Sequence, residues 1–141
     1  MKVFIDANIL VAVFNKEYPA YDSSARVLSL AGKPGVELVC STLSLGIAFY
    51  FAEKRCGRKR ALEKIATLCK HISISPCGSF EVQKALEHKD VDFEDALQEA
   101  SALGAGCDLI VTLNAKDFWF SKLEQYHPEY FLTRGFVPRH A

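Results

Sequence analysis

Short apolar segments typical of buried strands alternate along this chain with longer segments of helical periodicity. The strand-like segments are residues 3–6, 37–40, 71–75 and 109–112, and a last short strand is expected near 125–126. Successive parallel strands need a crossover, usually a helix, so this alternation predicts a three-layer α/β/α sandwich with a central parallel sheet. A chain of 141 residues can bury a core of its own, and we expect one domain over residues 1–141.

The segments between the expected strands have the apolar spacing and the end signals of helices. We predict helices at residues 7–14, 21–30, 42–55, 58–69, 80–88, 93–103 and 128–132. Ser41 or Thr42 is expected to cap the helix that runs to about Arg55, and Gly57 ends it. Asp92 is expected to cap the helix at 93–103.

Charge and cysteine content narrow the classes of function. Seventeen basic and seventeen acidic residues give a formal net charge of zero, so any phosphate binding must come from a local patch. Five cysteines without a Cys-x-x-Cys pair favour neither a zinc ribbon nor a disulfide framework, and reduced thiols are expected. Asp6 and Asn8 interrupt the apolar stretch of the first fourteen residues, which argues against a signal peptide. No apolar run reaches membrane-spanning length. We expect a cytoplasmic protein with no membrane segment.

Acidic and amide side chains lie where the predicted strands and helices meet. Asp6 ends the first strand, Asn114 and Asp117 follow the strand at 109–112, and Asp92 and Asp95 lie in the first turn of one predicted helix. In parallel sheets, sites form in the crevice beyond the carboxyl ends of the strands. Magnesium prefers oxygen ligands, and two such ions can activate water for phosphodiester hydrolysis. This pattern favours a metal-dependent nuclease.

Each of these residues also has an ordinary structural explanation. Asp6 could cap the first helix, and Asp92 with Asp95 could form an acidic variant of a capping box. Asn114 and Asp117 could form an Asx-turn. Their joint position at the strand ends of one sheet favours the metal-binding interpretation over three separate caps and turns.

Several motifs in order along the chain resemble those of the PIN domain. They are Asp6-Ala7-Asn8, Ser41-Thr42-Leu43-Ser44-Leu45, Asp92-Phe93-Glu94-Asp95-Ala96-Leu97, Thr112-Leu113-Asn114-Ala115-Lys116-Asp117-Phe118 and Pro128-Glu129-Tyr130-Phe131-Leu132. The likeness spans nearly the whole chain. It implies a sheet flanked by helices and a ribonuclease that depends on Mg²⁺ or Mn²⁺. Many bacterial and archaeal members of this family are toxins of toxin–antitoxin pairs, so the implied partners are RNA and a small antitoxin, and a homodimer is expected.

The resemblance also implies roles for individual residues. The implied catalytic residues are Asp6, Asp95, Asn114 and Asp117, and the implied metal ligands are Asp6, Asp95, Asn114 and Asp92. Asp6 would be the first acidic ligand, Asp95 the central one, and Asn114 would take the place of the last. Asn8 would orient Asp6 by hydrogen bonding. Asp92 would be either a supporting acid or only the helix cap.

One position departs from the family pattern. Where relatives carry a glutamate, or an asparagine in one branch, this chain has Ile47, which offers no oxygen to a metal. Glu53 cannot replace it from the same face, because six residues rotate a helix by about 240°. Leu113 likewise stands where many relatives carry arginine. Two functions are therefore open: a metal-dependent ribonuclease, or a catalytically weakened PIN-like module that binds RNA or a protein.

A basic cluster lies at the junction of two predicted helices. It consists of Lys54, Arg55, Arg58, Lys59 and Arg60. The last four are the candidate RNA-binding residues, since closely spaced cations can hold a phosphate backbone or an acidic partner. Alternatively, Lys54 and Arg55 complement the helix dipole and the others are solvated.

Two further groups of side chains have alternative interpretations. The aromatic run at 118–120 could stack on bases, although one or two of these rings are expected to fill the core or a dimer interface. Glu53, Glu94 and Glu99 are interpreted as solvated charges on helix faces.

Overall fold

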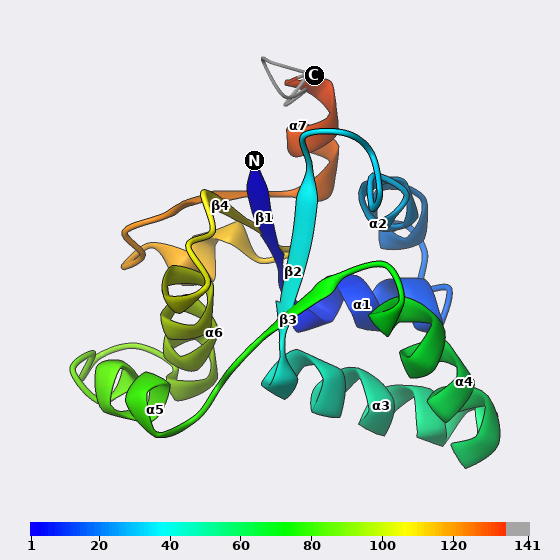
Figure 1. The fold of residues 1–141 in the computed structure, drawn as a ribbon, viewed down its shortest axis with the longest axis horizontal. Helices are drawn as coiled ribbons and strands as arrows, with labels where there is room; N and C mark the ends of the chain where they lie inside the picture. Colours follow the sequence, from blue (N-terminus) through cyan, green and yellow to red (C-terminus); the bar gives the residue numbers. More distant parts are fainter. Residues whose placement is uncertain (135–141) are drawn as a thin grey trace.

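A parallel sheet runs through the molecule with helices on both of its faces in the computed structural model (Figure 1). The structure describes residues 1–134, so residues 135–141 of the predicted domain lie outside the described residues. The five strands lie in the order β3-β2-β1-β4-β5, and every neighbouring pair is parallel. They are β1 (Lys2–Ile5), β2 (Glu37–Ser41), β3 (Ser73–Ser75), β4 (Leu109–Val111) and β5 (Glu124–Tyr126). The predicted three-layer sandwich is confirmed.

The helices divide between the two faces of the sheet. They are α1 (Ala7–Phe14), α2 (Ala20–Leu28), α3 (Thr42–Cys56), α4 (Arg58–Cys69), α5 (Ser79–Ala85), α6 (Phe93–Gly104) and α7 (Pro128–Thr133), with a 3₁₀ turn η1 (Ala115–Phe118). Helices α1 to α4 and α7 contribute to the core on one face, and α6 and η1 to the core on the other. None of the helices within the described residues has the length and apolar character needed to cross a membrane.

Alternating side chains of the central strands build two separate cores. Val3 and Ile5 of β1 face the core shared with α1 to α4, whereas Phe4 faces the core shared with α6. All three side chains are fully buried. A strand buried on both faces reads as a continuous apolar run, which is why the sequence indicates β1 and β4 so clearly.

Some predicted boundaries and one predicted environment are wrong. The strand predicted at 71–75 begins only at Ser73, because β3 is an edge strand whose pairing with β2 starts there. The helix predicted at 80–88 ends at Ala85. Glu99, interpreted as a solvated charge, is only 3% exposed. A buried carboxylate needs hydrogen-bond partners, and Glu99 accepts one from the backbone N–H of Lys122 at 2.8 Å.

Candidate active site

The pairing of β1 with β4 fixes the position and orientation of Asp6. The two strands are in register at Ile5 and Val111, and the Asp6 N–H donates to the Val111 carbonyl at 3.0 Å. The Asp6 carboxylate caps α1 by accepting from the Ala7 N–H at 2.8 Å. Its second oxygen accepts from the Thr112 hydroxyl, also at 2.8 Å. Both oxygens of Asp6 are therefore held in place at the carboxyl edge of the sheet.

Thr112 organises this edge, a role that the sequence reasoning missed. Its fully buried hydroxyl donates to Asp6 and accepts from the Asn8 side-chain amide at 3.2 Å and from the Asn114 N–H at 3.1 Å. Asn8 also accepts from the Leu113 N–H at 3.2 Å. Asn8, which we expected to orient Asp6 by hydrogen bonding, is joined to Asp6 through the Thr112 hydroxyl. The sequence does carry a signal for this role of Thr112, since it is a hydroxyl residue directly after the apolar strand β4.

Asp95 reaches the same crevice from the first turn of α6. Its backbone N–H donates to the Asp92 carboxylate at 3.1 Å, which makes Asp92 the N-cap, as predicted. Asp95 itself is partly buried, whereas Asp92 is exposed. Asp95 lies close enough to Asp6 for the charge of Asp6 to raise its pKa, so the first turn of α6 adjoins the edge of the sheet that holds Asp6.

Burial and neighbouring charges raise the pKa of Asp6. Loss of hydration is the largest cause and raises the pKa from 3.8 to about 6. The hydrogen bonds from Thr112 and Ala7 oppose this shift, and the charges of Glu94 and Asp117 add to it. Asp6 is thus a carboxylate that the fold keeps out of water and beside other acids.

The pKa of Asp95 is raised further, to about 7. Burial is again the first cause, followed by the charges of Asp6, Asp92, Asp117 and Glu94. Acids from β1, α6 and η1, far apart in sequence, therefore act on one another in one crevice. The sequence predicted Asp6, Asp92, Asp95 and Asp117 here. It did not predict Glu94, which is exposed, as expected, but lies close enough to perturb both Asp6 and Asp95.

Asn114 enters the site mainly through its backbone. It is exposed, its N–H donates to Thr112, and it directly precedes η1, which carries Asp117. The segment that brings both residues to the crevice thus starts from the same threonine that holds Asp6.

The donor set of the crevice suits a hydrated cation with oxygen ligands. Within residues 1–134, no group of three or more Asp, Glu, His or Cys side chains is arranged to hold a metal by itself. The side chains that meet here offer only oxygen, and their like charges repel each other when unpaired. An ion such as Mg²⁺ commonly takes one or two carboxylates, with water and substrate phosphate completing its shell. The residues present fit an ion held in that way.

Ile47 lies in a groove that it shares with Glu94. The groove measures about 780 Å³ and lies against α3, and its lining also includes Tyr50 and Leu97. Ile47 supplies no oxygen here, but the groove does contain a carboxylate, that of Glu94 on α6. Glu94 thus belongs to this groove and also raises the pKa of both Asp6 and Asp95.

A buried network sets the start of α3 against α6. Gln98 accepts from the Ser41 hydroxyl at 2.5 Å and donates to the Ser44 hydroxyl at 2.7 Å. Ser41 also caps α3 through the Ser44 N–H, as predicted. Because Gln98 lies one turn after Asp95, this network fixes the distance between the helix that carries Ile47 and the helix that carries Asp95.

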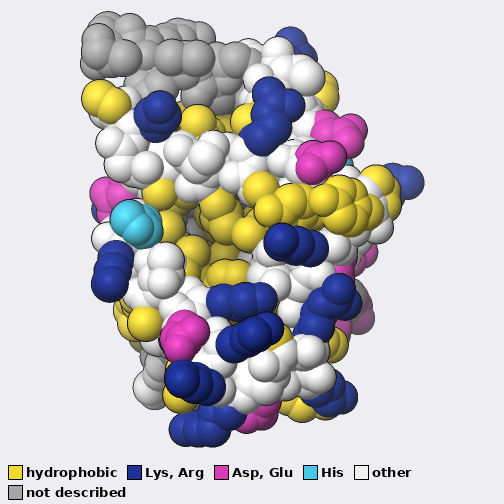
Figure 2. Space-filling view, turned by 90° about the vertical axis from the view of Figure 1, so that its right-hand side faces the viewer, with side chains coloured by type: hydrophobic (Ala, Val, Ile, Leu, Met, Phe, Trp, Pro, Cys, Tyr) yellow, Lys and Arg dark blue, Asp and Glu magenta, His cyan; other side chains and the backbone are white. Residues whose placement is uncertain are grey.

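The basic cluster divides between two surfaces. All five of its residues are exposed, around the turn at Gly57 between α3 and α4. Lys54 lies over the Tyr50 ring, 4.4 Å from its centroid, beside the groove that holds Ile47. Arg60 instead lines a hollow between α2 and α4. On that face, hydrophobic side chains gather in the hollow with Lys and Arg around it (Figure 2).

The aromatic run after Asn114 is partly in the core, as predicted. Phe118 is fully buried and stacks on Phe120, with ring centroids 6.0 Å apart. Trp119, by contrast, is 69% exposed. Phe118 therefore anchors the segment that carries Asp117, while Trp119 faces solvent.

Comparison with known proteins places the chain in a family. The model of the PIN domain matches residues 2–116, and the chain belongs to that family. Ribonuclease VapC1 of Aquifex aeolicus (strain VF5) is 30% identical over 138 residues, which cover 94% of each of the two chains.

Solved structures share the fold at lower sequence identity. The Mycobacterium tuberculosis toxin VapC20, which cleaves the sarcin–ricin loop, superimposes with a TM-score of 0.64 at 19% identity, over 96% of this chain and 97% of that one. A toxin–antitoxin complex from Klebsiella pneumoniae superimposes with a TM-score of 0.66 at 18% identity, over 89% and 97% of the two chains. At these identities the likeness concerns the fold alone.

Proposed function

We propose that this protein is a ribonuclease that hydrolyses RNA phosphodiester bonds with Mg²⁺ or Mn²⁺ and is the toxin of a toxin–antitoxin pair, acting in the cytoplasm. The observation that carries the proposal is that acids from separate elements act on one another at this edge: the Asp6 charge raises the pKa of Asp95, and the Asp117 and Glu94 charges raise the pKa of both. The ribonuclease name of the Aquifex aeolicus relative supports it. The proposed catalytic residues are Asp6, Asp95, Asn114 and Asp117, and the proposed ligands are Asp6, Asp95 and Asn114, with Asp92 supporting.

Each residue of the crevice has a distinct task in this proposal. A bound divalent ion would supply an activated water and stabilise charge on the phosphate. Asp6, whose two oxygens are fixed by Ala7 and Thr112, would hold the ion without rearrangement. Asp95 is less buried and would contact the ion from the opposite side of the crevice. Asn114 would add a neutral oxygen, which increases no repulsion between the acids.

The second candidate function is a PIN-like module that binds RNA or protein without efficient cleavage, and Ile47 favours it. Replacing Ile47 with glutamate should raise Mn²⁺-dependent cleavage of single-stranded RNA by at least about tenfold, because a carboxylate then joins the ligand shell. Initial rates on a labelled RNA measure the effect. Leu62→Glu, which adds the same charge at an exposed position on α4, is the control. Absence of cutting by both the wild type and Ile47→Glu would reject the enzyme and favour the binding module.

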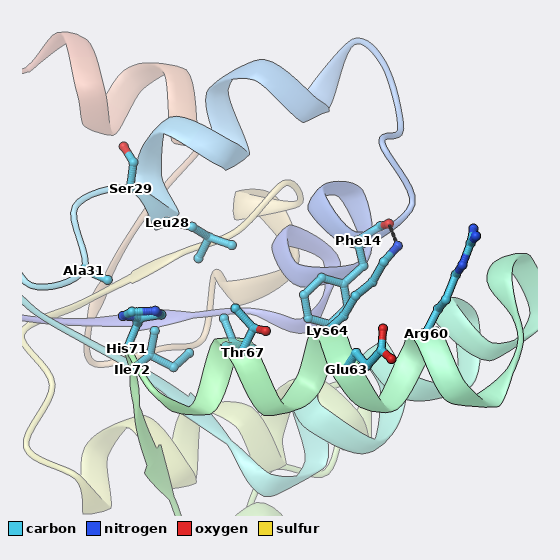
Figure 3. A pocket seen from close by; sticks show the side chains of 11 residues that line it. Phe14, Leu28, Ser29, Ala31, Arg60, Glu63, Lys64, Thr67, His71 and Ile72 are labelled. Atoms are coloured by element: carbon cyan, nitrogen blue, oxygen red, sulfur yellow. Dashed lines mark hydrogen bonds between the residues drawn. The ribbon is translucent and has the colours of Figure 1, made fainter.

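A hollow between α2 and α4, at the last residue of α1, offers a surface for a protein partner. It measures about 630 Å³, and apolar side chains of Phe14, Leu28 and Ile72 line it. Arg60 and Lys64 of α4 lie along its edge, and Lys64 donates to the Phe14 carbonyl at 2.6 Å (Figure 3). Such a surface suits an amphipathic segment that has apolar side chains for the hollow and acidic ones for its edge.

We propose that a small antitoxin binds in this hollow between α2 and α4. The basic edge and apolar lining supply the complementarity, and the Klebsiella pneumoniae structure is a complex of a toxin with its antitoxin. Leu28→Glu, which puts a charge in the hollow, should abolish co-purification with the co-expressed product of the neighbouring reading frame. Leu62→Glu, on α4 but outside the hollow, should co-purify like the wild type. Equal capture of that product by both variants would contradict this assignment.

We also propose a homodimer. Tyr50 and Phe51 of α3 and Phe80 of α5 expose large aromatic surfaces within the described residues. Exposed aromatic side chains of this size are typical of protein interfaces, so a second copy of the chain is the proposed cover for them.

A further inference from the structure

Glu99 binds two separate loops with one buried side chain. It lies one turn after Asp95 on α6, and its side chain is 4% exposed. One carboxylate oxygen accepts from the Lys122 N–H at 2.8 Å. The other lies 3.3 Å from Nε2 of His88. The carboxylate therefore joins the chain before α6 and the chain after η1 to the middle of α6.

Each of the two loops adjoins an element that carries an acid of the crevice. Residues 86–92 end in Asp92, which caps α6 at Asp95. The loop held at Lys122 follows η1, which carries Asp117. The His88 ring also packs on Phe120, with centroids 4.8 Å apart. Glu99 thus lies where both loops meet α6.

The segment at 114–122 is held at its start, its middle and its end, in addition to the packing of Phe120 on His88. The Asn114 N–H is bound to Thr112, Phe118 is buried in the core, and the Lys122 N–H is bound to Glu99. Thr112 also holds Asp6, and Glu99 shares a helix with Asp95. The segment that positions Asp117 is therefore attached at its start to Thr112, which holds Asp6, and at its end to α6, which carries Asp95.

An apolar residue would fill the site of Glu99 without the cost of burying a charge. A carboxylate, however, can accept from two donors on different loops, which an apolar side chain cannot do. A hollow of about 400 Å³ between α5 and α6, lined also by Phe80, His88 and Lys122, adjoins Glu99.

We propose that Glu99, through His88 and the Lys122 N–H, is a positioning residue that sets Asp117 and Asn114 against Asp95 for metal binding. This inference rests on the proposed nuclease function. It assigns to Glu99 no contact with RNA or with the ion, and its effect is transmitted through the two loops.

Trp119 makes the test independent of activity. It is the chain's single tryptophan and lies exposed in the attached segment. We expect Glu99→Ala to lower the fluorescence anisotropy of Trp119 and to weaken Mn²⁺ binding in calorimetry by about tenfold or more, the usual effect of losing an outer-shell partner. Glu99→Gln keeps an acceptor for the Lys122 N–H, so it should retain most of the Trp119 anisotropy and most of the Mn²⁺ affinity of the wild type. Glu87→Gln, exposed at the same hollow, should match the wild type.

Unchanged Trp119 anisotropy and Mn²⁺ affinity in folded Glu99→Ala would overturn the proposal. If Glu99→Ala does not fold, the same measurements on His88→Ala test the proposal. His88 is one third exposed, and its replacement removes only one of the two contacts of Glu99. An intermediate fall in anisotropy supports the proposal, and an unchanged value overturns it. A wild type that binds no Mn²⁺ would reject the nuclease, while the Trp119 result would still decide whether Glu99 holds the segment.

Discussion

Replacing Asp95 with asparagine should lower Mn²⁺-dependent cleavage of single-stranded RNA by at least about a hundredfold, and Asp6→Asn should do the same. Asparagine keeps the size of the side chain and one acceptor oxygen. At Asp6 that oxygen can still cap α1 at Ala7, so the fold should persist. Each variant removes a negative charge from the crevice, and with it one of the ligands proposed to hold the ion and the attacking water.

Initial cleavage rates and Mn²⁺ calorimetry on the same samples measure this effect. Asp108→Asn is the matched control. Asp108 is exposed before β4, at the amino edge of the sheet, where it accepts from the Lys2 N–H at 2.8 Å. It should retain wild-type cleavage and ion affinity. Equal cleavage by the wild type, Asp6→Asn and Asp95→Asn would show that any activity comes from elsewhere.

Without a divalent ion, the protein should lose stability as the pH rises from about 4 to about 7. The folded pKa values of Asp6, about 6, and Asp95, about 7, lie above the ordinary value of 3.8. In this range the folded state retains protons that the unfolded chain has released, so raising the pH favours unfolding. The stabilisation is complete below pH 3.8 and is lost as the pH passes both folded pKa values. For Asp6, a shift of about two pKa units corresponds to about 3 kcal/mol, and the more solvated Asp95 adds less.

Urea unfolding in EDTA at pH 4 and pH 8 measures this loss in the free energy of unfolding. Asp6→Asn should reduce the difference between the two pH values, since its amide does not titrate and only the contribution of Asp95 remains. Adding Mn²⁺ at pH 8 at about 100 times its Kd should return about 2.7 kcal/mol to the wild type. The assignment of the pH effect to the crevice fails if the wild type and Asp6→Asn show the same pH dependence.

The central part of the fold follows directly from local sequence. Residues 3–5 and 109–111 are apolar throughout because β1 and β4 are covered on both faces. The edges were harder to predict. The apolar residue Ile72 was predicted to lie in a strand. It is buried, but pairing with β2 begins only at Ser73.

The site could be predicted where its residues end an element. Asp6 follows a buried strand and Asp95 lies in a capped first turn, and both positions carry local signals. Thr112 and Glu99 depend on partners that are distant in sequence: Thr112 meets Asp6 across the β1–β4 pairing, and Glu99 meets Lys122 of a packed loop. On a helical wheel, Glu99 is indistinguishable from a surface glutamate. Only tertiary packing reveals that it is buried.

Anomalous scattering from crystals grown with MnCl₂ would decide whether the acids share an ion. We expect a manganese peak in the crevice at the carboxyl edge of β1 and β4, coordinated by the carboxylates of both Asp6 and Asp95. Absence of a peak at that edge at millimolar MnCl₂, or a peak that neither carboxylate coordinates, would contradict the proposed metal-dependent nuclease.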